Sequence, residues 1–286
     1  RPVTDKYVSV TGCVKSPCSF WAPLGTPYRD LIARAGGATV QECAILISGI
    51  LMGKITFDPD EVVTKTCAGI ILLPRDHSLI RRKTKTSPER KKIGKSACDQ
   101  CSYCTEFCPR YLLGYEVQPH KVMRGLGFSP TGAPQHNQWA ELCCSCGLCT
   151  LYACPEDLYP REHCDEAKAD MRRAGIKFTQ TAPVRVHPMK ESRRVPLKLL
   201  RKRLKVEEFE SDAPHQPEAC QPERVLLKLS QHVGKPARPV VSAGDRVNRA
   251  DCVARVAAED LGVDLHASVN GTITRVTEDF IEIQRG

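Results

Sequence analysis

The chain has 286 residues, of which 41% are hydrophobic and 26% charged, a composition typical of a folded protein with two or three domains. It contains no run of about 18 apolar residues and does not open on a signal-peptide pattern, so we expect neither a membrane span nor secretion. The formal charge of +9 alone would suit nucleic acid or a membrane surface, but sixteen cysteines point to a different chemistry.

Residues 1–80 are predicted to form a small domain of strands and one helix. β-Branched residues alternate with small or polar ones in the first strand, and Thr26 and Pro27 are expected as N-cap and first residue of the helix. Gly36-Gly37 ends that helix. The predicted strands span 7–14, 44–50 and 69–73, and the predicted helix spans 28–35. This order indicates a β-grasp-like unit.

The middle of the chain is basic and rich in cysteine. Residues 81–97 carry two runs of positive charge, which we interpret as a solvated helix or linker, with a docking surface for an acidic partner as the alternative. The cysteine-rich region spans 81–176, and a helix at 165–175 is predicted to close it. A linker at 177–222 is predicted to contain a basic amphipathic helix at 191–206.

Residues 223–286 return to short strands separated by turns. Gly244-Asp245 and Asn270-Gly271 are the turn signals. The predicted strands span 225–229, 238–241, 253–257, 263–267, 273–276 and 280–283. This pattern indicates an all-β barrel or sandwich.

Two cysteine runs with regular spacing carry the chemistry. The first run is Cys98-x2-Cys101-x2-Cys104-x3-Cys108-Pro109, and the second is Cys143-x2-Cys146-x2-Cys149-x4-Cys154-Pro155. The first matches the bacterial ferredoxin spacing, whereas the second has one extra residue before its final Cys-Pro. Structural zinc on CxxC pairs is the alternative, but zinc requires neither cysteine triplets nor the added Cys-Pro. The runs therefore predict two [4Fe-4S] clusters.

The spacing also predicts which cysteines share a cluster. Three thiolates at i, i+3 and i+6 reach three irons of one cubane, and the cysteine before proline points to the other cluster. The predicted ligands are Cys98, Cys101, Cys104 and Cys154 for the first cluster, and Cys108, Cys143, Cys146 and Cys149 for the second. Cys144 and Cys164 are left over. The x2 spacing favours Cys143 over Cys144, and a swap between these two stays open.

Bound clusters change the expectation for partners. Each [4Fe-4S]2+ cluster with four thiolates carries two negative charges, so two clusters remove about four units from the formal charge of +9. We therefore expect no nucleic-acid partner. Cysteines at metal-ligand spacing also indicate a reducing compartment, the cytoplasm.

Beyond the cysteine runs, the chain resembles the RnfC-like family. The similarity to its SLBB β-grasp domain rests on VTGCV at 10–14, GTP at 25–27, AGG at 35–37 and, with three departures, SGILMG at 48–53. The similarity to its C-terminal barrel-sandwich hybrid rests on QHVGKPA at 231–237, GDRV at 244–247 and HASVNG at 266–271. The resemblance implies an α+β multidomain chain. Its expected parts are an SLBB β-grasp domain at 1–80, an α-helical, bacterial-ferredoxin-like double [4Fe-4S] domain at 81–176, the linker at 177–222, and an all-β barrel-sandwich hybrid at 223–286.

Within that family, three stretches resemble its cobalamin reductases. They are CDQCSYCTE at 98–106, PHKVMR at 119–124 and CTLYACPEDL at 149–158. The resemblance implies a flavoenzyme that carries electrons from NADH through FMN and two [4Fe-4S] clusters to cobalamin, inside a bacterial microcompartment. The implied partners are a flavin/NADH domain or subunit, a corrinoid or redox-protein acceptor, and a microcompartment shell protein.

One departure from the family limits what this chain is expected to do. The glycine-rich FMN/NADH segment that precedes the β-grasp domain in the family has no counterpart here. FMN is therefore expected in the full-length protein but not on this chain, which we interpret as the C-terminal part of a longer reductase with no catalytic residue of its own. Two alternatives stay open: an RnfC-type component of a membrane electron-transport complex, and a non-enzymatic scaffold with structural clusters.

Overall fold

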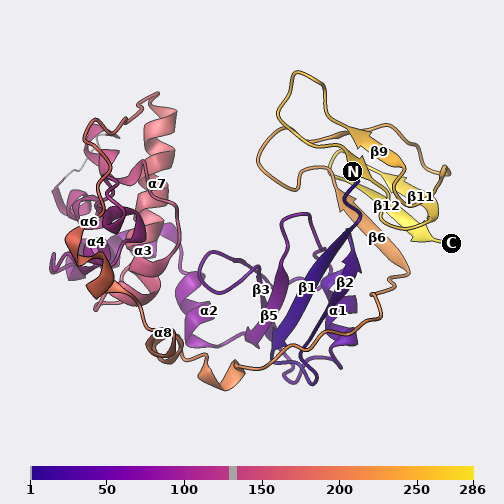
Figure 1. The fold of residues 1–286 in the computed structure, drawn as a ribbon, viewed down its shortest axis with the longest axis horizontal. Coiled ribbons are helices and arrows are strands. Elements are labelled where there is room, and N and C mark those ends of the chain that lie inside the picture. Colours follow the sequence, from indigo (N-terminus) through magenta and orange to yellow (C-terminus); the bar gives the residue numbers. More distant parts are fainter. Residues whose placement is uncertain (1, 129–133) are drawn as a thin grey trace. The chain divides into compact units, whose positions relative to one another are not determined.

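A computed structural model describes residues 2–128 and 134–286 of the chain (Figure 1). These residues form two compact units. The β unit combines Arg1–His77 with Phe209–Gly286, and the helical unit is Ser78–Glu208. The helical unit is therefore an insertion between the two parts of the β unit. No helix in the described ranges is long and apolar enough to cross a membrane.

The N-terminal part of the β unit is a five-stranded sheet with the strand order β2-β1-β5-β3-β4. β1 pairs in parallel with β5, and the other neighbours are antiparallel. The three strands predicted from the sequence are confirmed as β1, β3 and β5. β2 was not predicted because its residues are buried on both faces and do not alternate. The strands are β1 Asp5–Gly12, β2 Cys18–Pro23, β3 Cys43–Ile47, β4 Lys54–Thr56 and β5 Gly69–Pro74.

The single helix of this part, α1 (Tyr28–Arg34), buries Tyr28 and Leu31. The predicted N-cap was wrong by one residue: Pro27 is the N-cap, and the Thr26 hydroxyl donates to the carbonyl of Pro23 at 2.7 Å. Gly36 and Gly37 end the helix as predicted, at φ values of +79° and +86° that favour glycine.

The C-terminal part of the β unit consists of two small sheets, with strand orders β10-β9-β7 and β6-β12-β11-β8. Alternation places Val225 and Leu227 of β6, and Ile281 and Ile283 of β12, in the core. Each predicted strand has a counterpart, and the short β8 is an addition. The strands are β6 Arg224–Lys228, β7 Arg238–Pro239, β8 Arg246–Val247, β9 Cys252–Arg255, β10 Leu265–His266, β11 Gly271–Val276 and β12 Phe280–Arg285.

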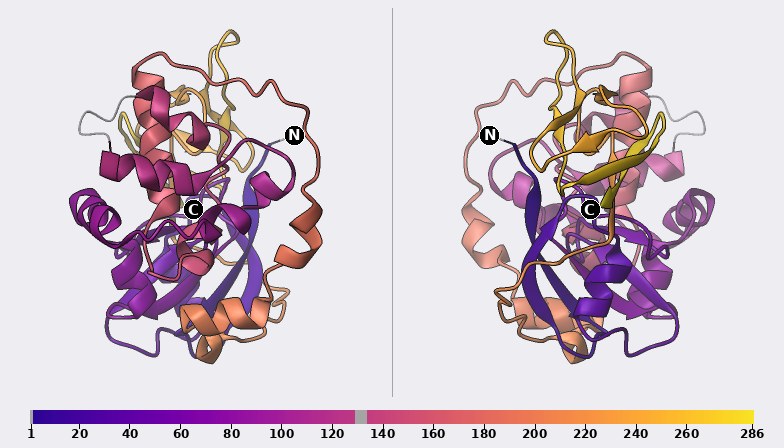
Figure 2. Two further views of the ribbon diagram at one scale, coloured as in Figure 1. Left: turned by 90° about the vertical axis from the view of Figure 1, so that its left-hand side faces the viewer. Right: turned by 90° about the vertical axis from the view of Figure 1, so that its right-hand side faces the viewer.

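The two parts of the β unit share one apolar core, which contains residues from both sheet systems. The C-terminal strands lie next to the start of β1 (Figures 1 and 2). The backbone N–H of Leu226 donates to the carbonyl of Gly25 at 2.9 Å, and the buried hydroxyl of Ser268 donates to the carbonyl of Leu24 at 2.6 Å. These bonds tie the start of the chain to its end.

Gly25 is the residue at this junction that should tolerate substitution least. Its φ is +84°, and a Cβ at this position would lie 2.8 Å from the backbone nitrogen of Leu226. Gly37 has a similar φ of +86° but has no atom within 4 Å of such a Cβ. We therefore expect Gly25→Ala to lower the free energy of unfolding of the β unit by about 2 kcal/mol or more, and Gly37→Ala by about 1 kcal/mol. Urea denaturation measures these free energies of unfolding. Equal losses in the two variants would show that the close approach of Leu226 to Gly25 has no effect on stability.

The helical unit is built from short helices that surround the cysteine runs. α3 begins at a capping box in which the Thr86 N–H donates to Glu89 Oε2 at 2.8 Å. The predicted closing helix is confirmed as α7 but begins five residues earlier than expected, because Pro160 starts its first turn. The helices are α2 Ser78–Lys83, α3 Ser87–Ala97, α4 Tyr103–Glu106, α5 Pro109–Leu112, α6 Pro119–Phe128, α7 Pro160–Arg173 and α8 Leu197–Leu204.

The prediction of a single basic helix at 191–206 was wrong. A 3₁₀ turn at Pro188–Arg193 and the helix α8 take its place, and Pro196 separates them as the N-cap of α8. The surrounding segment divides between the two units. The N–H of His187 donates to Leu112 of the helical unit at 2.9 Å, whereas the N–H of Cys220 donates to Trp21 of the β unit at 2.8 Å.

Candidate iron-sulfur centre

The four cysteines predicted for the first cluster line one pocket in the helical unit. Cys104 lies in α4, and Cys154 follows the helical turn of the second run; both are buried. Burial, followed by the proximity of Cys154, Cys101 and Cys98, raises the pKa of Cys104. The pocket is lined in part by Cys98, Cys101, Cys104, Cys154, His120, Met123 and Leu158. The fold thus brings residues from both runs to one place.

The four cysteines predicted for the second cluster also lie close together. The pKa of Cys108 is raised to about 11, mainly by burial and in smaller part by the nearby Cys143 and Cys146. Cys149 is buried, and Cys104, Cys143, Cys108 and Cys146 all add to the rise in its pKa. Because Cys104 belongs to the first set and Cys149 to the second, the two sets are neighbours.

These surroundings fit iron-sulfur clusters. All sixteen cysteines are free thiols. Within residues 2–128 and 134–286, no three His, Cys, Asp or Glu side chains are close enough to hold one metal ion. A [4Fe-4S] cluster needs a wider arrangement, since each of its four irons takes one thiolate. The thiolate forms of buried, neighbouring cysteines repel one another, so binding to the positively charged irons of a cluster stabilises them strongly. The assignment of the eight cysteines as ligands stays a prediction.

The extra residue in the second cysteine run is accommodated by a π-helix at Cys149–Ala153. The N–H of Cys154 donates to the carbonyl of Cys149 at 3.1 Å, five residues back. In the first run, the corresponding N–H of Cys108 donates to Thr105, three residues back, at 2.9 Å. A π turn takes up one inserted residue without ending the helical path, and such turns are frequent at functional sites. The x4 spacing therefore leaves Cys154 directed at the first set.

Hydrogen bonds to the cysteine sulfurs are a feature that the sequence did not reveal. The Gln100 side chain donates from Nε2 to the Cys98 sulfur at 3.2 Å. Arg124 donates from Nε to Gln100 Oε1 at 3.2 Å. Because an arginine can only donate, it selects the amide orientation in which Nε2 faces the sulfur. The backbone N–H of Ser145 donates to the Cys143 sulfur at 3.3 Å, and the backbone N–H of Leu158 donates to the Cys154 sulfur at 3.3 Å.

Gln100 should therefore tune the reduction potential of the first cluster. Hydrogen bonds to ligand sulfurs stabilise the reduced, more negative form. Replacing Gln100 with Leu is expected to lower the midpoint potential of that cluster by roughly 20–60 mV, the equivalent of one modest hydrogen bond. Potentiometric EPR titration measures this. Gln118→Leu is the control, since Gln118 donates to no cysteine among the residues that the structure describes, and equal potentials in both variants would exclude the role of Gln100.

The two leftover cysteines have different surroundings. Cys164 lies in α7, is completely buried and packs against Cys143. The Cys164 thiol donates a hydrogen bond that lowers the pKa of Cys143 to about 6, while the same bond and burial raise the pKa of Cys164. Cys144 is exposed, and its thiol is hydrogen-bonded to Cys146. The position of Cys143 beside Cys108 supports the predicted preference for Cys143 over Cys144.

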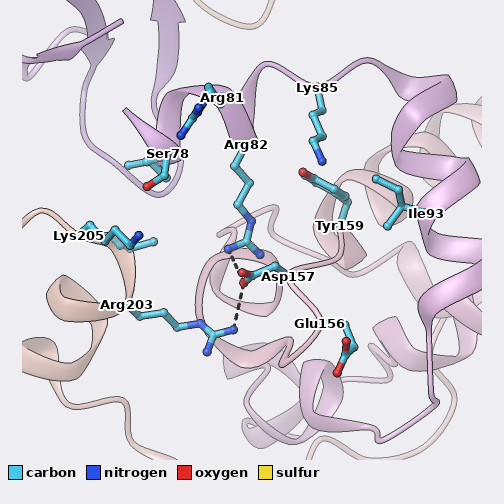
Figure 3. Close-up of a pocket in the computed structure, with 12 residues that line it drawn as sticks. Ser78, Arg81, Arg82, Lys85, Ile93, Glu156, Asp157, Tyr159, Arg203 and Lys205 are labelled. Carbon is cyan, nitrogen blue, oxygen red and sulfur yellow. Dashed lines mark hydrogen bonds and ion pairs between the residues drawn. The ribbon is translucent and has the colours of Figure 1, made fainter. Parts of the chain in front are cut away.

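Two arginines hold the loop that carries Cys154. Arg82 of α2 donates to the carbonyl of Thr150, and Arg203 of α8 donates to the carbonyl of Cys154. Both arginines also reach Oδ1 of Asp157, at 2.7 Å from Arg82 and 3.2 Å from Arg203 (Figure 3). α2 and α8 therefore fix the position of a predicted ligand through its backbone.

Comparison with known proteins supports this picture for each part of the chain. Residues 7–47 match the SLBB domain, residues 97–159 the 4Fe-4S dicluster domain, and residues 207–285 the RnfC barrel sandwich hybrid domain. The dicluster match implies two [4Fe-4S] clusters. These matches confirm the three domain types and the fold class expected from the sequence.

The similarity to curated proteins extends over the whole chain. All 286 residues align with cobalamin reductase PduS, at 34% identity for the Salmonella typhimurium protein and 33% for that of Citrobacter freundii. The chain spans 63% of the length of each of these relatives. A component of the ion-translocating oxidoreductase complex of Vibrio cholerae is 34% identical over 122 residues, which are 42% of this chain and 14% of that protein. The chain therefore carries SLBB, 4Fe-4S dicluster and RnfC barrel-sandwich domains and is an iron-sulfur electron-transfer module similar to PduS and RnfC proteins.

Proposed function

We propose that this chain is the electron-transfer part of a flavin/iron-sulfur oxidoreductase that reduces a corrinoid. NADH and FMN bind to a domain or subunit outside these 286 residues, and cobalamin receives the electrons. The observation that carries the proposal is the pairing of two four-cysteine sets that meet at Cys104 and Cys149. Similarity to cobalamin reductase PduS over the full chain supports the corrinoid as acceptor. The proposed location is the cytoplasm, within a bacterial microcompartment whose shell proteins are further partners.

Bound [4Fe-4S] clusters supply reversible one-electron transfer. The chain's own residues provide the surroundings that this chemistry needs. Cys104, Cys108, Cys149 and Cys154 are buried, so water has little access to their sulfurs. Hydrogen bonds from Gln100, Ser145 and Leu158 hold three sulfurs in place and favour the reduced charge state.

Reconstitution with a flavin/NADH domain or subunit tests the proposal. We expect NADH to reduce hydroxocobalamin in the complete, iron-loaded protein. The rate should fall by at least about 100-fold in a Cys104→Ser, Cys149→Ser double variant that keeps its flavin, since the flavin loses its route to the acceptor. Visible spectroscopy follows the corrinoid. Unchanged rates in the double variant would show that the cysteine sets do not serve cobalamin reduction.

A role within a membrane electron-transport complex is the second candidate. The observation that favours it is the partial similarity to components of ion-translocating oxidoreductase complexes. Under this alternative the chain should co-purify with integral membrane proteins from mild detergent. Recovery without any such protein, together with cobalamin reduction by the complete protein, favours the corrinoid reductase.

A further inference from the structure

The helical unit contains a basic cavity of about 380 Å³ that the electron-transfer function does not explain. α2, Lys85 just before α3, Ile93 within α3, the loop after Cys154 and the end of α8 surround it (Figure 3). Five cationic side chains and two acidic ones line the cavity. They are Arg81, Arg82, Lys85, Arg203, Lys205, Glu156 and Asp157.

Some of these charges are already neutralised and others are not. Arg82 and Arg203 are both committed to Asp157 and to backbone carbonyls. Among the described residues, the Arg81 side chain has no hydrogen bond or ion pair. Lys85 has the ring of Tyr159, 5.9 Å from its ammonium, and an electrostatic interaction with the exposed Glu89. Within the described residues, neither Arg81 nor Lys85 forms an ion pair with Glu156 or Asp157, the acidic residues of the cavity lining, so both supply positive charge to it.

The remaining wall of the cavity is apolar. Leu79, Ile93, Leu204 and the ring of Tyr159 line it together with the cations. A volume of about 380 Å³ lies within the range of small-molecule sites, in which apolar walls contact most of the ligand and a few polar groups orient it. An occupant that fits both surfaces has an anionic end and an apolar or ring-shaped end.

We propose that this cavity binds a small organic phosphate. Arg81 and Lys85 contact the phosphate oxygens, for which arginine has the matching array of donors. The apolar wall receives the organic part of the ligand. Arg82 and Arg203 are positioning residues, because their guanidinium groups hold Asp157 and the Cys154 loop in place.

The position of the cavity gives the ligand a second effect. Asp157 lines the cavity, and Arg203 connects it directly to the carbonyl of Cys154. A phosphate at this place adds negative charge close to the first cysteine set. Negative charge disfavours reduction of a nearby cluster, so binding should lower the midpoint potential of the first cluster and leave the second less affected.

Calorimetry on the iron-loaded full chain tests the site, with ADP as the organic phosphate probe, inorganic pyrophosphate as the anion alone, and adenosine as the ring alone. We expect ADP to bind more tightly than either of the others. Arg81→Gln combined with Lys85→Gln should weaken ADP binding by roughly ten-fold or more. The same variant should lose the ADP-dependent shift in potential. Lys198→Gln combined with Lys202→Gln is the matched control, since it removes two exposed charges from α8 outside the cavity.

Three results would overturn the proposal. Equal ADP affinity in the wild-type chain and the Arg81/Lys85 variant would show that the cavity is not the site. Equal losses of ADP affinity in the Arg81/Lys85 and Lys198/Lys202 variants would show that ADP responds to general surface charge and not to this cavity. Pyrophosphate binding as tight as ADP binding would show that the apolar wall contacts no ligand. None of these measurements depends on cobalamin reduction, so they can reject the binding site without rejecting the proposed function, and the reverse also holds.

Discussion

Removal of iron is expected to unfold the helical unit and to leave the β unit folded. The buried apolar residues in the described part of the helical unit include four predicted ligands, Cys104, Cys108, Cys149 and Cys154. The β unit has a continuous apolar core that draws on both of its parts. Since metal ligands form part of the core of the helical unit, the cysteine-metal bonds should account for much of its folding energy.

Chelation of iron under anaerobic, reducing conditions tests this expectation by hydrogen exchange. Amides of α6 and α7 should lose most of their protection, while those of β1 and β12 keep theirs. Proteolysis of the chelated protein should cut within Ser78–Glu208. The two end fragments should then co-purify, because they remain joined by bonds such as that from the N–H of Leu226 to the carbonyl of Gly25. Equal loss of amide protection in both units would contradict the expectation that only the helical unit depends on iron.

Paired cysteine substitutions are expected to show that each cluster takes one ligand from the opposite run. In the crossed arrangement, Cys108→Ser and Cys143→Ser affect the same cluster, so the double variant should keep about four irons per chain. Cys108→Ser combined with Cys101→Ser affects both clusters and should leave almost none. The physical reason is the position of Cys108, which lies beside Cys143 and Cys146 rather than facing the first pocket.

An uncrossed arrangement predicts the opposite pattern for the same two variants. Cys101 and Cys108 would then share a cluster, and their double variant would keep about four irons. Iron and acid-labile sulfide analysis of purified protein decides between the two. The Cys252→Ser variant serves as the control, because Cys252 lies in β9 of the β unit and is not among the predicted ligands, and it should retain the iron content of the wild type.

The sequence predicted the parts of this protein that depend on local spacing. The regular cysteine intervals indicated two sets of four, and the structure groups the same residues from Cys98 to Cys154. Alternating apolar residues and turn signals located the C-terminal strands. In these cases a short stretch of chain determines the result.

Features that depend on contacts distant in sequence could not be predicted. The β unit includes both ends of the chain, and no local pattern shows that its two parts share a core. The Arg124–Gln100–Cys98 series joins residues on separate elements. The x4 interval before Cys154 was visible, but the π turn that accommodates it is a property of the folded backbone. Two prolines left signals in the sequence that could have been used: Pro196, which divides the expected basic helix, and Pro160, which starts α7.

The most direct test of the central claim is quantification of metal and sulfide in the anaerobically purified chain, followed by EPR after dithionite reduction. Two cubanes predict about eight irons and eight sulfides per chain and a broadened spectrum from two interacting [4Fe-4S]+ clusters. Fewer than about six irons per chain, or stoichiometric zinc in their place, would contradict the account.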